Sequence, residues 1–127
     1  MERDLELIRE IIEAVAKWSD RQARRVEIDG FDRVLVDHHV DLCVAKGLLK
    51  AIDVTCLADQ SPQYLVISIT FEGYDFLDMA RSKEVWRRAK DTVAAIGGGT
   101  SFEVFKAVLA EVGKSAAMNV LQGKAAF

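Results

Sequence analysis

The sequence has few of the features that mark secreted, membrane-spanning or disulfide-bonded proteins. Its 127 residues include one proline and two cysteines, and Cys43 and Cys56 do not have the spacing of a disulfide framework. No apolar run approaches the ~18 residues that a membrane-spanning helix needs. The charged start Met-Glu-Arg-Asp is not followed by the apolar segment of a secretory signal. We therefore expect a cytoplasmic protein with reduced thiols and no membrane association.

Neither sign of charge is in large excess. The formal net charge is −3, which offers no global attraction to a polyanion, although a local basic patch can still exist. The chain has no internal repeat and no low-complexity tract. Half of its residues are hydrophobic, enough for one compact domain with a single core.

Residues 32–49 are the centre of the fold that we expect. Val36, Val40 and Cys43 lie at i, i+4 and i+7, on one face of a helix. Gly47 then supplies the left-handed residue that commonly ends a helix, and a strand-like run follows. A helix that stops at glycine and turns directly into a strand is typical of the third helix and wing of winged-helix domains.

The flanking segments complete this prediction. Asp4 caps an N-terminal core helix, Val26 to Ile28 alternate like a short strand, and residues 52–56 and 65–69 alternate like the two strands of a hairpin. Thr70 caps a further helix, Ser82 starts another, and Thr100 with Glu103 fits a capping box for a last helix. The sequence thus predicts an α+β, winged-helix-like domain over residues 1–80. Its two- to three-stranded antiparallel wing is followed by a C-terminal helical extension over 81–127, packed on it as one unit.

Three stretches resemble a known family. They are M-E-R-D-L-E-L-I-R, H-V-D-L-C-V-A-K-G-L-L, and I-T-F-E-G-Y-D-F-L-D followed by Trp86 and Lys90. In this order they are similar to motifs of the bacterial and bacteriophage domain-of-unknown-function 2513 family. The matching positions are Arg3, Asp4, Leu7, Ile8, Arg9, His39, Leu42, Gly47, Leu48, Thr70, Glu72, Gly73, Asp75, Phe76, Leu77, Asp78, Trp86 and Lys90. Phe71 replaces the usual tryptophan and Tyr74 the usual histidine. The resemblance implies a small winged-helix-like bacterial or phage protein, suspected of DNA binding or regulation.

The helix around His39 offers the first candidate site. Its expected outward face includes Asp37, His38 and Asp41, two carboxylates without a basic partner. Such a face suits phosphates poorly, so a partner-binding or solvated surface is the better interpretation.

Basic residues gather in two other places. Arg21, Arg24 and Arg25 lie near the short strand, and Lys83, Arg87 and Lys90 share one face of the penultimate helix. They are either solvated charges balanced by neighbouring acids or a footprint for DNA phosphates or an acidic partner.

The sequence contains no pattern typical of a catalytic or cofactor site. Adjacent His38 and His39 point about 100° apart on a helix, so they do not chelate one ion easily. The glycine run at 97–99 lacks the ending of a P-loop. We expect no enzyme, no metal and no cofactor.

Two functions therefore stay open. One is a DNA-binding accessory or regulatory protein that contacts the backbone of duplex DNA. The other is a protein-interaction module of phage or prophage origin. We also expect a homodimer through the apolar C-terminal segment. The last helix and its tail carry Phe105, Val108, Leu109, Val112, Met118, Leu121 and Phe127.

Overall fold

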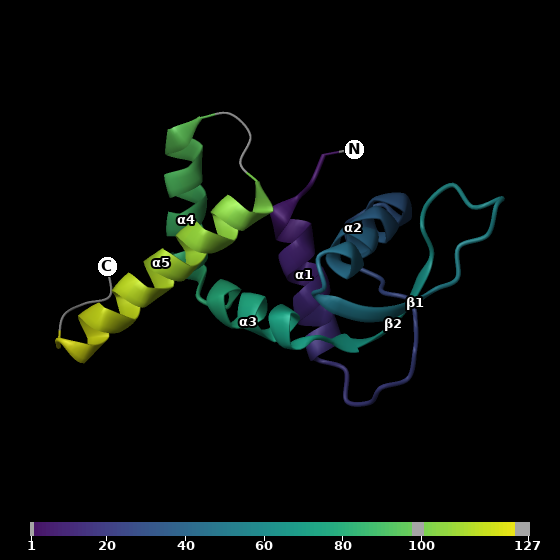
Figure 1. Ribbon diagram of the computed structural model, residues 1–127, viewed down its shortest axis with the longest axis horizontal. Helices are drawn as coiled ribbons and strands as arrows, with labels where there is room; N and C mark the ends of the chain where they lie inside the picture. The colour runs from purple at the N-terminus through teal and green to yellow at the C-terminus, as the bar shows by residue number, and fades with distance from the viewer. Residues whose placement is uncertain (1, 98–100, 124–127) are drawn as a thin grey trace. The chain divides into compact units, whose positions relative to one another are not determined.

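A computed structural model describes residues 2–97 and 101–123 of the protein. Helix α1 spans Leu5–Ala16 and helix α2 spans Arg33–Ala45. The Asp4 carboxylate caps α1 by accepting from the backbone N–H groups of Glu6 and Leu7 at 3.0 and 3.3 Å. The α1 stripe, formed by the buried residues Leu7, Ile8, Ile11, Ile12 and Val15, packs on α2 and on the hairpin that follows (Figure 1).

Helix α2 ends as the sequence predicted. Gly47 adopts a left-handed conformation with φ of 81°. The N–H of Leu48 donates to the carbonyl of Cys43 at 2.9 Å, and the N–H of Gly47 donates to that of Val44 at 3.0 Å. This pair of bonds is the Schellman motif, which satisfies the last carbonyls of a helix and turns the chain. The chain enters strand β1 two residues after Gly47.

The sheet is a two-stranded antiparallel hairpin. Strand β1 spans Leu49–Asp53 and strand β2 spans Tyr64–Ile69. The prediction placed the first strand at 52–56, which is wrong: Val54 and Cys56 lie beyond β1 and are exposed. The register shifts between Lys50, opposite Ser68, and Ala51, opposite Val66. This shift makes Ile67 the extra residue of a β-bulge, a feature that re-aims a side chain.

A third segment joins the hairpin at a single position. Arg24 and Val66 exchange two backbone hydrogen bonds, with N–O distances of 3.1 and 2.7 Å. The prediction of a short strand at 26–28 is therefore wrong in position. The pairing with β2 lies at Arg24, and Val26 belongs to no strand.

The remaining helices are α3, Phe71–Ala80, α4, Lys83–Ile96, and α5, Phe102–Leu121. Ser82 and Ser101 cap α4 and α5 by accepting from the N–H groups of Val85 and Val104. The cap of α5 is thus Ser101 and not Thr100. Thr100 itself, with Gly98 and Gly99 of the glycine run and Phe127 of the tail, lies outside the described residues.

Helices α4 and α5 pack on each other. The rings of Trp86 and Phe105 meet edge to face, with centroids 5.1 Å apart. Val85 and Ala89 are buried with them. Ile96, which the apolar spacing of this helix would place on the same inward face, is instead 66% exposed. In α3 the side chains of Phe76 and Leu77 are buried, whereas Phe71 at the start of the helix is 80% exposed.

The chain divides into two compact units, residues 1–77 and 78–127. The first contains α1, α2, the hairpin and most of α3, and the second contains α4 and α5. The buried apolar residues of the first unit are Leu7, Ile8, Ile11, Ile12, Val15, Val26, Val36, Val40, Cys43, Leu48, Leu49, Val66, Ile69, Phe76 and Leu77. The packing of the C-terminal helices on the first unit stays a prediction.

Candidate functional site

Asp37 does not lie on an open face of α2. It is 9% exposed, and its carboxylate accepts from the Arg25 guanidinium at 3.2 and 3.3 Å. The Ser61 hydroxyl and the Gln63 side-chain amide donate to the same carboxylate at 3.1 and 3.0 Å. The expectation that Asp37 faces outward is therefore wrong. We call Arg25, Asp37, Ser61 and Gln63 the Asp37 cluster; it ties the loop between β1 and β2 onto α2.

The other two residues of the expected partner face are half-buried. The Tyr64 hydroxyl donates to the Asp41 carboxylate at 2.8 Å. This bond favours the protonated phenol and, with burial, raises the pKa of Tyr64 to about 12. The ring of His38 stands edge-on to that of His39, with centroids 5.8 Å apart. Asp37, His38 and Asp41 thus do not form one solvated surface.

His39 is fully buried. Its Nε2 atom accepts from the backbone N–H of Asp4 at 2.8 Å, and its Nδ1 atom lies 2.8 Å from the carbonyl oxygen of Leu35. A neutral ring with its proton on Nδ1 satisfies both contacts, because the carbonyl only accepts and the amide only donates. The ring therefore joins the start of α1 to the first turn of α2, and neither nitrogen is left for a ligand.

The N-terminal basic residues are engaged to different degrees. Arg24 donates to the Asp20 carboxylate at 2.6 Å, and its guanidinium lies 4.2 Å from the Trp18 ring centroid. Arg25 belongs to the Asp37 cluster. Arg21 is exposed, and within the described part of the chain it forms no ion pair. Of the three residues predicted to contact nucleic acid here, Arg21 is the one whose charge stays available.

The second basic group lies on α4. Arg87 donates to Glu84 at 2.7 Å and lies 3.8 Å from Asp91. These acids hold the pKa of Arg87 above its ordinary value, chiefly through the hydrogen bond to Glu84. Lys83 is exposed and Lys90 is half-buried. Arg87 is thus a solvated cation whose charge is balanced by acids on the same helix, which is one of the two interpretations open from the sequence.

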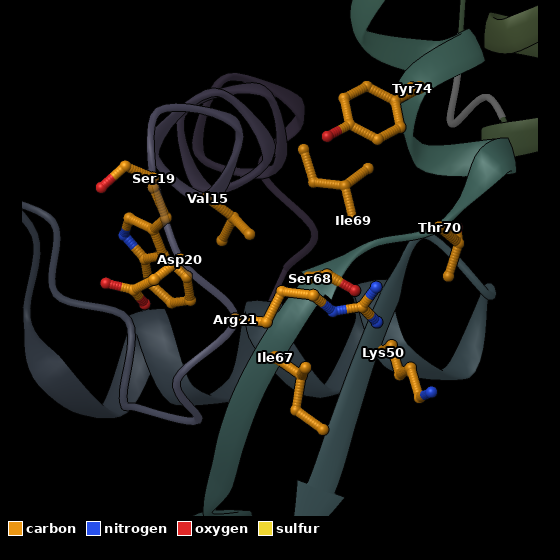
Figure 2. A pocket seen from close by; sticks show the side chains of 11 residues that line it. Val15, Ser19, Asp20, Arg21, Lys50, Ile67, Ser68, Ile69, Thr70 and Tyr74 are labelled. Atoms are coloured by element: carbon orange, nitrogen blue, oxygen red, sulfur yellow. The ribbon is translucent and has the colours of Figure 1, made fainter.

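An open pocket of about 420 Å³ surrounds Arg21 (Figure 2). It is lined by Val15, Trp18, Ser19, Asp20, Arg21, Lys50, Ile67, Ser68, Ile69, Thr70 and Tyr74. Lys50 adds a second exposed cation from β1. The bulged Ile67 takes part in the lining together with the buried side chains of Val15 and Ile69. The pocket combines two cations, several hydroxyls and an apolar wall.

Sequence reasoning missed Lys50, because the predicted strand began after it. The bulge at Ile67 of β2 lies opposite Lys50 and Ala51 of β1, so the partners of Lys50 depend on a register that the sequence does not display. The signal that was present is its position directly after the buried Leu48 and Leu49.

The loop between the strands is acidic. A pocket of about 410 Å³ is lined by Asp41, Asp53 and Asp59 together with Thr55 and Tyr64, among others. The hydroxyl and then the N–H of Thr55 donate to Asp53 and hold the pKa of that carboxyl below its usual value. Among the described residues no group of three or more histidine, cysteine or acidic side chains could hold a metal ion.

Comparisons with known proteins agree with the motifs of the sequence. The sequence profile of the family described as "Hypothetical protein (DUF2513)" matches residues 2–100. The chain belongs to this family. A protein of Haemophilus influenzae described as "Uncharacterized protein" is 29% identical over 110 residues, which cover 85% of this chain and 92% of that protein. No solved structure shows a significant match. In the described part of the chain, no helix has the length and apolar character needed to cross a membrane.

Several residues that carry the resemblance to the domain-of-unknown-function 2513 family meet at one joint. Thr70 Oγ1 donates to the Gly47 carbonyl and accepts from the N–H of Gly73, and the N–H of Thr70 donates to the Leu48 carbonyl. A Cβ on Gly73 would lie 2.2 Å from the Leu48 oxygen and 2.5 Å from the Ile69 side chain. Only glycine fits this approach of α3 to the end of α2. These family positions thus hold the first unit together.

Proposed function

We propose that the first unit is a winged-helix-like module that acts in the cytoplasm by binding another protein, without catalysis. The order of elements supports the winged-helix assignment: a helix, a bridging segment, a helix that ends in a Schellman motif, and a hairpin. The bridging segment pairs with β2, so the spatial order is β1, β2, then Arg24. Helix α2 is then the counterpart of the helix that reads bases in DNA-binding members of such folds.

The observation that carries the proposal is the closed face of α2. Base readout requires side chains that are free to reach donors and acceptors in the major groove. Here Asp37 is engaged by Arg25, Ser61 and Gln63, and Asp41 is engaged by Tyr64. The same contacts fix the β1–β2 loop against the helix, where it would obstruct a duplex.

The ion pairs that the arginines already form also favour protein binding over DNA binding. Backbone binding gains its affinity when lysine and arginine neutralise phosphates and release counterions. Arg24, Arg25 and Arg87 already neutralise carboxylates of this chain. They would have to exchange existing partners for phosphates, which reduces the electrostatic gain. The pocket around Arg21 and Lys50 keeps its charge, and its lining includes Trp18 and Tyr74. Arginine, tryptophan and tyrosine are enriched at protein-protein interfaces.

Affinity capture tests the proposal. The immobilised protein is compared with an Arg21→Glu/Lys50→Glu variant and with a Lys17→Glu/Arg33→Glu variant, in a lysate of the cell that produces it. Lys17 and Arg33 are exposed cations of the same unit that lie outside the pocket. We expect at least one protein to be retained by the wild type and the control variant and lost by the pocket variant.

A mobility-shift series covers the DNA alternative. We expect duplex DNA to show no retardation at physiological salt. Retardation there, abolished by Arg87→Glu with Lys90→Glu, would contradict the proposal and support phosphate contacts from α4.

The expected homodimer stays a separate prediction. Beyond Leu109, α5 has no buried residue up to Leu121, and Met118, Val120 and Leu121 are 46, 65 and 79% exposed. Sedimentation of the full chain against one that ends at Lys114 tests it: a dimer that becomes a monomer on truncation is the expected result.

A further inference from the structure

We infer that the pocket around Arg21 and Lys50 recognises an acidic side chain of a partner protein together with a neighbouring apolar side chain. This inference rests on the proposed protein-binding function and specifies its ligand. It follows from the charge inside the pocket, from the free hydroxyls, from the apolar wall and from the charge outside the pocket.

The pocket has a positive charge that its own residues do not balance. Arg21 and Lys50 line it from the loop after α1 and from β1. In Figure 2 the Arg21 side chain crosses in front of β2, with its guanidinium drawn beside Ser68, and Lys50 extends from β1. The one carboxylate in the lining is Asp20. It already accepts from Arg24 at 2.6 Å and from the Gln22 N–H at 3.0 Å. An anion entering the pocket therefore meets two cations and a carboxylate that is already neutralised.

Hydroxyl groups add hydrogen-bonding capacity. Ser19, Ser68 and Tyr74 line the pocket, and none of their hydroxyls has a partner within the described part of the chain. Thr70 is different, because its hydroxyl is used at the joint between α2 and α3. A carboxylate accepts up to about four hydrogen bonds, and bonds from charged donors are roughly twice as strong as neutral ones. The lining can supply such a set.

The apolar wall gives room for a second side chain. Val15 and Ile69 are 4 and 7% exposed, and Ile67 and the half-buried Trp18 extend the surface. The volume of about 420 Å³ falls in the range of ligand sites, about 300–1,000 Å³. An aliphatic or aromatic residue next to the acidic one would bury its surface against this wall.

The charge outside the pocket selects a short anion over a polyanion. On α1 and the segment after it, four acids line another pocket in which Lys17 is the one cation: Glu10, Glu13, Glu27 and Asp29. At the other end of the hairpin, Asp41, Asp53 and Asp59 line another. A nucleic acid long enough to extend past Arg21 and Lys50 would approach these carboxylates, whereas one acidic residue in a peptide would not. This contrast favours a protein segment over DNA or RNA.

Nuclear magnetic resonance of the full chain tests the inference with its own internal control. The chain has two tryptophans, Trp18 in the pocket and Trp86 on α4. The probes are end-capped hexapeptides with a central Leu-Glu or Phe-Glu pair, and the control peptides carry Gln in place of Glu. We expect the Glu peptides to shift the indole N–H signal of Trp18 and the amide of Ser68, and to leave the Trp86 indole unmoved.

Affinities follow from the same titrations. The Gln peptides should bind about tenfold more weakly, since they lose the charge-assisted bonds. The Arg21→Glu/Lys50→Glu variant should lose the Trp18 shift, and the Lys17→Glu/Arg33→Glu variant should retain it. A fold check of both variants by the dispersion of their spectra ensures that loss of binding is not loss of structure.

Three outcomes would overturn the inference. The first is that no Glu peptide shifts Trp18 in the folded protein. The second is equal binding of Glu and Gln peptides. The third is displacement of the peptide by a short single-stranded or duplex DNA at physiological salt, which would assign the pocket to nucleic acid. If capture from the lysate depends on Arg21 and Lys50 while no Glu peptide binds, the acidic ligand is wrong and the protein-binding function stands.

Discussion

Asp37 in the first unit and Arg87 in the second unit have partners at very different distances along the chain. In the first unit Asp37 joins groups that lie 12 to 26 residues away, from the segment after α1 and from the β1–β2 loop. In the second unit Arg87 pairs with Glu84 and Asp91, three and four residues away on the same exposed helix face. Pairs of the first kind fix tertiary structure. Pairs of the second kind support one helix and respond to salt.

The largest expected effect tests whether the first unit depends on the α1 stripe. Ile12 is fully buried, and Glu13 beside it is exposed. Ile12→Asp should unfold this unit, since a buried unpaired charge costs several kcal/mol, roughly the whole stability of a small domain. Glu13→Gln is the matched control. With 5-fluorotryptophan incorporated, fluorine spectra report Trp18 and Trp86 separately. An Ile12→Asp protein with a native Trp18 signal would show that the stripe has been misassigned.

Gly73 in the first unit and Gly113 in the second differ in how closely they are packed. Gly73→Ala should destabilise the first unit by about 1–3 kcal/mol, because its methyl group would overlap the Leu48 carbonyl and the Ile69 side chain. Gly113→Ala on α5 meets only Val85, at 3.8 Å, so the higher helix propensity of alanine should stabilise that helix by up to about 1 kcal/mol. Urea midpoints of the two fluorine signals measure both effects. Equal shifts for the two variants would contradict the close approach at Gly73.

The Asp37 cluster supplies the next effect. Asp37→Ala should cost the first unit about 1–3 kcal/mol, since Ser61, Gln63 and the partly exposed Arg25 lose their shared acceptor. It should also release the β1–β2 loop, which amide hydrogen exchange of residues 54–63 would detect. A double variant with Arg25→Met tests the coupling. Strict additivity of the two changes would argue against a direct pair.

How much of this the sequence could predict depends on the range of the interaction. Periodicity identified α1, the buried face of α2 and the helix end at Gly47, because each of these depends on neighbours within a few residues. The same periodicity placed the polar residue Asp37 on the outward face of α2. It could not show the groups that contact Asp37, because they come from distant segments. The cap of α5 was misplaced by one residue, since Thr100 and Ser101 are adjacent hydroxyls with equal capping chemistry.

The sequence predicted a hairpin, but it placed the first strand three residues too late. Ile52, Val54 and Cys56 alternate with polar residues, which suggested one half-buried face. In the structure Ile52 and Val54 are 48 and 42% exposed, and pairing stops at Asp53. The bulge at Ile67 shifts the partners of β1, and such a shift depends on packing against the rest of the sheet. The pocket residue Lys50 could not be found for the same reason.

Alkaline pH should lower the stability of the first unit more than that of the second. Burial raises the pKa of Cys43 to about 12, and the Asp41 bond raises that of Tyr64 to about 12. A group whose pKa is raised on folding stabilises the fold below its unfolded pKa, here 9.0 for cysteine and 10.0 for tyrosine, and this contribution falls as pH rises towards 12. All cysteines and tyrosines lie in the first unit.

The expected result is a urea midpoint for Trp18 that falls above about pH 9 while that for Trp86 falls less. Tyr64→Phe should flatten part of this fall. A profile for that variant parallel to the wild type would show that the Tyr64–Asp41 bond contributes little.

The smallest effect belongs to the exposed pairs of α4. Arg87→Ala should leave the urea midpoint of Trp86 unchanged within error, because both partners are solvated and side-chain entropy offsets the attraction. A clear loss of stability, reduced by added salt, would place these pairs in the same class as the Asp37 cluster and remove the contrast between the units.

The contact between Asp4 and His39 has a consequence for the nascent protein. The amide that opens α1 needs an imidazole that is synthesised 35 residues later. At about 5–20 residues per second, α1 waits for seconds with its apolar stripe unpaired before that ring leaves the ribosome. During this interval α1 is an amphipathic helix in an incomplete chain, with apolar surface of the kind that makes such species prone to aggregate. The first unit can therefore begin to form its tertiary contacts only after α2 has been synthesised.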